Sequence, residues 1–186
     1  SSPTLRYYTL VAPVDSVPQQ RGAPAPFQFE MLPVLLPVQV DQPPLVVRQG
    51  DGSLAILDTE RWGAPLGDEF HDALTARLEQ HWGRRDVAGL PKNSHEPVLS
   101  LRAGVRRFES VPGQFARIDV VWNLSLRNGG SGSKRENLTC SSVIRENAAA
   151  GMENLVLAHQ RAVSRLAEEI AQTASNWSQQ RTSSCP

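Results

Sequence analysis

The sequence predicts a single α/β domain in which amphipathic helices pack on a largely antiparallel sheet. Two stretches, one ending at Trp82 and one at Ala174, repeat apolar residues every three or four positions, as amphipathic helices do. Between them, three runs alternate apolar and polar residues, as strands with one buried face do. With 186 residues, 40% of them hydrophobic, the chain can bury one core of its own.

Charge and hydropathy exclude two classes of function. The chain has 19 basic and 19 acidic side chains, so the basic footprint of a nucleic-acid-binding protein is missing. No apolar run approaches the roughly 20 residues that a membrane-spanning helix needs. We therefore expect no nucleic-acid partner and no membrane-spanning segment.

Residues 1–26 are expected to form an extended arm or tether. Most of the 14 prolines lie in the first third of the chain, and the run Ala12–Pro26 has no strong periodicity. The abrupt start Ser1–Pro3 carries no initiator Met, which suggests that a processed segment or an upstream anchor has been removed. We expect one domain over residues 27–176 and a tail over residues 177–186.

Two strand elements follow this arm. Phe27–Leu36 is rich in alternating apolar residues and is predicted to be a strand, while Pro33 leaves its register uncertain or places it near a sheet edge. Leu45–Arg48 and Leu54–Leu57 flank the sequence Gly50-Asp51-Gly52, which is the pattern of a β-hairpin.

The stretch Arg61–Trp82 is predicted to contain a helix that packs on the sheet. Phe70, Leu74 and Leu78 recur every four residues and form one apolar stripe. A cap at residues 67–68, which are Gly and Asp, marks its start.

The same helix raises the question of a metal or acid/base site because it contains two histidines and four carboxylates. At a rise of about 1.5 Å per residue, His71 and His81 lie about 15 Å apart and cannot bind one ion. Carboxylates one turn from a histidine are common on exposed helices. The charges therefore indicate a solvated helix face.

Three further strands are predicted over Val98–Glu109, Phe115–Leu126 and Arg135–Ile144, in an antiparallel meander. Phe108 breaks the alternation of the first run, which suggests a β-bulge or the end of the strand. The glycine-rich segment Arg127–Lys134 joins the last two strands as a hairpin loop.

Met152–Ala174 is predicted to be a long amphipathic helix with His159 on or beside its apolar stripe. A lone histidine there is more often a satisfied boundary residue than a ligand. No grouping of histidine, cysteine or serine matches a known catalytic or metal-binding spacing, so the sequence assigns no catalytic, metal-binding or cofactor-binding residue.

The two cysteines, Cys140 and Cys185, leave two alternatives open. An even count in an exported protein permits one disulfide. Cys140 also points with Leu138 and Ile144 toward the predicted core, where a free thiol is equally at home.

Five short sequence words carry a resemblance to a known family, in order and at compatible spacings over nearly the whole chain. They are YYTL (Tyr7–Leu10), LPVLLPVQVDQPPLVVR (Leu32–Arg48), RW (Arg61–Trp62), RRFE (Arg106–Glu109) and the ending RAVSRLAEEIA (Arg161–Ala171). With these words the chain resembles the bacterial ABC-type transport auxiliary lipoproteins, the group that includes PqiC (YmbA). The family positions that the resemblance marks as structural are Tyr7, Tyr8, Pro33, Pro37, Arg48, Arg61, Trp62 and Phe108.

The resemblance implies a mixed sheet packed between helices in three α/β/α layers, somewhat like the N-terminal domain of TolB. It also implies a lipoprotein with no enzymatic activity and no cofactor, held at the periplasmic face of the bacterial outer membrane by an N-terminal lipidated cysteine. That cysteine is absent from the sequence, so we expect it immediately before Ser1 in the precursor.

The implied partners are a periplasmic MCE-domain protein, which the lipoprotein docks at the outer membrane, and indirectly an inner-membrane ABC transporter that moves lipid. An alternative is a periplasmic protein that itself binds lipid or another small apolar ligand, which a continuous apolar cavity between helix and sheet would favour. We also expect a ring-like homo-oligomer, in which Val46, Val121, Val143 and Leu157 are candidates to face a neighbouring subunit.

Overall fold

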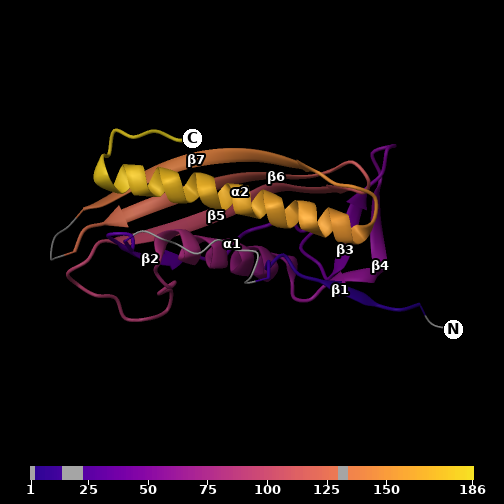
Figure 1. Ribbon diagram of the computed structural model, residues 1–186, viewed down its shortest axis with the longest axis horizontal. Helices are drawn as coiled ribbons and strands as arrows, with labels where there is room; N and C mark the ends of the chain where they lie inside the picture. The colour runs from indigo at the N-terminus through magenta and orange to yellow at the C-terminus, as the bar shows by residue number, and fades with distance from the viewer. Residues whose placement is uncertain (1–2, 14–22, 130–133) are drawn as a thin grey trace.

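A computed structural model describes residues 3–13, 23–129 and 134–186 and contains two sheets and two α-helices (Figure 1). Residues 14–22 of the predicted arm and residues 130–133 of the predicted hairpin loop lie outside the described residues. The elements in chain order are β1 (Arg6–Tyr8), β2 (Gln28–Met31), β3 (Pro44–Arg48), β4 (Leu54–Trp62), α1 (Leu66–Trp82), β5 (Val98–Val111), β6 (Phe115–Arg127), β7 (Arg135–Asn147) and α2 (Met152–Gln179).

The larger sheet has the strand order β2-β5-β6-β7. β5, β6 and β7 form the predicted antiparallel meander. A register shift between Val105 and Arg107 confirms the bulge that the phase break at Phe108 suggested. β2 pairs with β5 in parallel, which makes the sheet mixed.

The first predicted strand is shorter than expected and lies at a sheet edge. β2 ends at Met31, after which the chain follows β5 only intermittently and Leu35 forms an isolated bridge with Gly104. Pro33 has no N–H to donate, so the ladder breaks beside it. The edge position that this proline suggested is therefore correct, and the predicted length of the strand is not.

The smaller sheet has the order β1-β4-β3, and β3 and β4 form the predicted hairpin. β1 pairs in parallel with β4, with Tyr7 opposite Arg61 and Tyr8 opposite Trp62. The expectation that residues 1–26 are a tether therefore does not hold at β1, which is part of a sheet. A three-residue strand is too short to show alternation, and its partner lies far along the chain.

The helix α1 begins at Leu66, slightly before the predicted cap. Its cap hydrogen bond comes from a distant loop, because the Gly67 backbone N–H donates to Asp41 Oδ1 at 3.1 Å. In the first turn, the buried side chain of Glu69 accepts a hydrogen bond from Thr9 Oγ1 at 2.7 Å. These contacts fix both the start of α1 and the segment that follows β1.

Both helices pack on the same face of the larger sheet, and α2 crosses in front of β5–β7 in Figure 1. Phe108 of β5 contacts Phe70 of α1, with ring centroids 6.4 Å apart, and stacks on His159 of α2 at 4.0 Å. The α/β class is confirmed, but the expected arrangement of three layers is wrong for the described residues. Side chains on the other face of β5–β7 are mostly polar, so that face is stable in water without a second helical layer.

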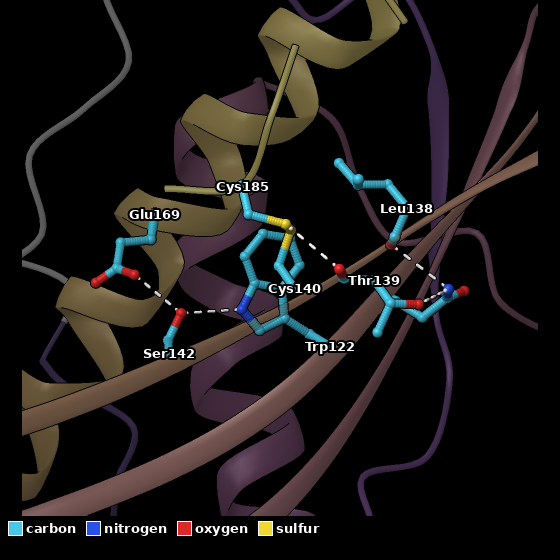
Figure 2. Close-up of a disulfide and its surroundings, with 8 residues drawn as sticks. Trp122, Leu138, Thr139, Cys140, Ser142, Glu169 and Cys185 are labelled. Carbon is cyan, nitrogen blue, oxygen red and sulfur yellow. Dashed lines mark hydrogen bonds between the residues drawn. A yellow bond between two sulfur atoms is a disulfide. The ribbon is translucent and has the colours of Figure 1, made fainter. Parts of the chain in front are cut away.

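A disulfide joins Cys140 of β7 to Cys185 in the segment that follows α2 (Figure 2). Of the two alternatives for the cysteines, the structure therefore contains the bridge. Beside it, Trp122 Nε1 of β6 donates to Ser142 Oγ at 3.0 Å, and this hydroxyl donates to Glu169 Oε1 of α2 at 2.9 Å. The disulfide and this chain of hydrogen bonds tie α2 and the tail to the sheet.

Candidate functional site

The candidate site lies on the face of the larger sheet that the two helices leave uncovered, which we call the open face. It consists of the outward side chains of β5–β7 and the edge segment 33–37. Four residues lie side by side across it, one on the edge segment and one on each of β5, β6 and β7: Leu35, Gly104, Val121 and Ser141. Gly104 has no side chain, and a Cβ there would meet only the Val121 carbonyl oxygen at 3.9 Å. The middle of this row is therefore hollow.

The hollow is a groove of about 700 Å³. Its lining is mainly apolar and consists of Pro33, Leu35, Leu36, Pro37, Arg102, Ala103, Gly104, Val105, Arg106, Val121 and Asn123. A smaller hollow of about 300 Å³ adjoins it, because Pro37 and Arg106 line both. Leu35 is 73% exposed at the rim, so the apolar surface is accessible to a partner.

Two arginines flank Gly104 on β5. Arg102 and Arg106 lie two residues to either side of it, both are exposed, and both line the groove. Neither guanidinium group has an ion pair or hydrogen bond in the described part of the chain. An apolar groove with two unpaired guanidinium groups suits an apolar group next to carboxylate or phosphate oxygens.

The carboxylates of the open face are already paired. Glu109 lies 2.7 Å from Arg48 and 3.3 Å from Arg107, and Asp119 lies 2.9 Å from Arg117. Outward arginines outnumber these two carboxylates: on β5–β7 they are Arg102, Arg106, Arg107, Arg117, Arg127, Arg135 and Arg145. The open face is therefore basic, although the chain has no net charge.

The positions that the family resemblance marks fall into three places. Pro33 and Pro37 line the groove, and Arg48 lines the adjoining hollow. Trp62 and Phe108 are buried and touch edge to face, with ring centroids 6.1 Å apart. The remaining three, Tyr7, Tyr8 and Arg61, sit in the smaller sheet, where β1 and β4 pair. Their structural importance to the family stays a prediction.

A buried Ser–His contact lies on the opposite, helix-covered face. Ser110 Oγ is 2.8 Å from His159 Nε2, but the two residues are only 4% and 1% exposed. Burial lowers the pKa of His159 to about 3, so the imidazole is neutral at physiological pH. His159 Nδ1 has no partner in the described residues, so no acid orients the ring. This pair is a packing contact with no access for a substrate.

The remaining histidines and the helices add no second candidate. The His71 ring hydrogen-bonds to its neighbour Asp72, with Nδ1 and Oδ1 2.9 Å apart, and His81 and His95 are exposed, near the end of α1 and in the loop before β5. No cluster of three metal-ligating side chains exists within the described ranges. No helix among those described is long and apolar enough to span a membrane.

Sequence reasoning missed the groove. The available signal was Gly104 within a strand, since an interior glycine often marks a place where another group approaches closely. Arginines two residues to either side of it share its face of the strand, because side chains alternate with a period of two. The contribution of Leu35 depends on a parallel bridge that no local pattern indicates.

Comparison with known proteins identifies a family. A family model for the ABC-type transport auxiliary lipoprotein component matches residues 8–171. No curated protein matches the sequence. The matched range contains all five words on which the resemblance rests, except for the first residue of YYTL.

Two solved structures have similar folds. One is a protein from Xanthomonas campestris, with 20% identity and a TM-score of 0.63 over 95% of this chain and 99% of that chain. The other is an uncharacterized protein, with 17% identity and a TM-score of 0.67 over 91% of this chain and 98% of that chain. At such identities the likeness shows the fold alone.

Proposed function

The chain belongs to the family of ABC-type transport auxiliary lipoprotein components, and we propose that it is a non-enzymatic docking component of an MCE-type lipid-transport system. The family places it in the cell envelope as part of a transport system. The finer proposal is that the lipid-anchored protein sits at the periplasmic face of the outer membrane and receives the periplasmic MCE-domain protein there.

The open face is the observation that supports docking over catalysis. Its groove is a broad apolar surface flanked by the cations of Arg102 and Arg106, which suits a macromolecular contact. A catalytic site needs a nucleophile or a general base in contact with its substrate. Ser110 and His159, which have such chemistry, are sealed in the core.

The docking proposal is tested with the full-length precursor expressed together with the MCE-domain protein of its own system. We expect the lipoprotein in the outer-membrane fraction, and we expect the MCE protein to co-purify with it after solubilisation in mild detergent. The control replaces the cysteine expected before Ser1 by serine, which should release the protein from the membrane. A precursor with no cysteine there, or a lipoprotein that does not retain the MCE protein, contradicts the proposal.

We further propose that identical subunits form a ring that receives the tubular end of the partner. Closed cyclic symmetry lets identical subunits present a matching rim. Two residues expected to face a neighbouring subunit are exposed, Val143 at 63% and Leu157 at 47%, and Val121 lines the groove. Light scattering coupled to size exclusion should give a multiple of 20.4 kDa at micromolar concentration, and a mass of one subunit contradicts the ring.

Direct binding of lipid is the second candidate, and the groove is the observation that favours it. A volume of about 700 Å³ is in the range of small-molecule sites. The groove lies on the open face, however, so a bound acyl chain would keep one side in water. Native mass spectrometry of the purified protein tests this candidate: a co-purified lipid that Gly104→Trp removes supports it, and a bare chain mass rejects it.

A further inference from the structure

We propose that the open face binds the helix layer of a second copy of this chain, front to back. The helix layer is the outward surface of α1 and α2, on the opposite side of the molecule from the open face. The inference rests on the proposed ring and names the two surfaces that build it.

The open face, which is the front surface of this contact, combines unpaired arginine side chains with exposed apolar side chains. Arg102 and Arg106 have no partner in the described part of the chain and stand on either side of the bare floor at Gly104. Leu35 is 73% exposed at the rim, and Val143 is 63% exposed on β7. Water would be released from this apolar surface, and both cations would gain partners, if an anionic surface covered it.

The back surface has the opposite charge. The partly or fully exposed carboxylates of the two helices that do not bond to the sheet are Asp68, Asp72, Glu79, Glu153 and Glu168. The helices carry three arginines, of which Arg161 and Arg165 both pair with Glu146 of β7. Leu157, which is 47% exposed on α2, is an apolar residue available to a groove.

The distribution of charge indicates that a second copy of the chain covers the open face and that the two copies meet front to back. The open face has more arginines than carboxylates and the helix layer has more carboxylates than arginines, so every copy carries both halves of a complementary contact. Front-to-front and back-to-back contacts bring like charges together. Front-to-back contact is heterologous and closes into a ring when the rotation between copies divides a full turn. An anionic membrane would match the front surface but would leave the acidic back and Leu157 without a role.

Charge reversal on each surface tests the contact by light scattering at micromolar concentration. The front variant is Arg102→Glu with Arg106→Glu, and the back variant is Asp72→Arg with Glu168→Arg. The wild-type particle should have a mass that is a multiple of the single-chain mass of 20.4 kDa. We expect the mass of each variant to fall to that of one chain, and we expect the chain with all four changes to regain the mass of the wild-type oligomer. In about 1 M salt, where the screening length is about 3 Å, the wild-type mass should also fall.

Two further variants keep the test independent of folding and of overall charge. Gly104→Trp fills the groove without changing charge, and Gly104 does not have a positive φ, so a side chain is tolerated there. It should also give the single-chain mass. Arg6→Glu with Arg85→Glu changes the net charge as much as the front variant does, but on neither surface, and should keep the multiple. Circular dichroism should show native secondary structure in every variant.

The outcomes separate this contact from the broader proposals. A wild-type mass of 20.4 kDa overturns both the contact and the ring. A wild-type multiple that the front variant or the back variant retains overturns the contact and leaves the ring standing. A front variant that keeps the multiple but no longer binds vesicles of phosphatidylglycerol assigns the front surface to the membrane and overturns the contact. Co-purification with the MCE protein tests docking separately.

Discussion

Val143 and Ile144 are neighbours on β7, yet the first is 63% exposed and the second is fully buried. The same contrast runs along β5 and β6, whose inward side chains meet the two helices and whose outward side chains form the open face. The helix-covered face is apolar, densely packed and tied by hydrogen bonds and a disulfide. The open face is basic and grooved. The difference teaches that the covered side of these strands supplies the core, whereas the outward side of the same strands is free for the contacts proposed above.

Truncating a side chain of the covered face should have the largest effect on stability. Ile144→Ala removes a fully buried side chain and should lower the free energy of unfolding by about 2–5 kcal/mol, because it leaves a cavity against α2. Its matched control is Val143→Ala, the adjacent residue on the open face, which should change stability by less than about 0.5 kcal/mol. Urea titration followed by tryptophan fluorescence measures both, and equal losses would contradict the division between the two faces.

Removing the disulfide should lower the free energy of unfolding by a somewhat smaller amount. Cys185→Ala opens a bridge between residues separated by 45 positions, and the greater freedom of the unfolded chain should cost about 2–4 kcal/mol. Reducing agent should lower the urea midpoint of the wild type toward that of the variant and leave the variant unchanged. A variant as stable as the oxidised wild type would show that α2 and its tail are held without the bridge.

Acid should weaken the covered face through His159. Burial lowers its pKa from 6.5 to about 3, so the unfolded chain binds the proton more readily than the folded chain does. The associated stability is fully present above pH 6.5 and is lost as the pH falls toward 3. Between pH 6.5 and pH 5 the loss should lie between about 1 and 2 kcal/mol, because the slope rises from half of about 1.4 kcal/mol per pH unit at the unfolded pKa to nearly that value at pH 5.

The control for this pH dependence is His159→Gln, which keeps a polar group near Ser110 Oγ and does not titrate. Urea unfolding at several pH values should give a shallower dependence for this variant than for the wild type. Parallel curves would mean that the folded protein lets solvent reach His159 when it is protonated.

Neutralising the open face should have the smallest effect on stability. Arg102→Gln with Arg106→Gln removes two side chains that have no partner in the described residues, so the free energy of unfolding should change by less than about 0.5 kcal/mol. The measurement uses the lowest concentration that fluorescence allows, because association would otherwise add to the apparent stability. A loss above 1 kcal/mol would show that these arginines stabilise the fold itself.

Much of the fold and little of the candidate site were predictable from the sequence. Strict alternation around Trp122 and Leu124 predicted the meander, the phase break at Phe108 predicted the bulge, and the five words predicted the family. The groove was not predictable, because its rim residue Leu35 and its floor residue Gly104 come from segments far apart in the sequence. Neither segment carries a sequence pattern that indicates a groove, and the groove forms only where the edge segment pairs with β5.

The sequence by itself determined which side of each strand and helix is apolar, because side chains repeat with a period of two on strands and 3.6 on helices. Only the tertiary structure decided what each apolar side would meet. It placed α1 and α2 on one face, where Phe108 touches both, and it paired β1 with β4. It also joined Cys140 to Cys185. The physical reason is that periodicity is a local property of the chain, whereas contact between two surfaces depends on residues that only the folded chain brings together.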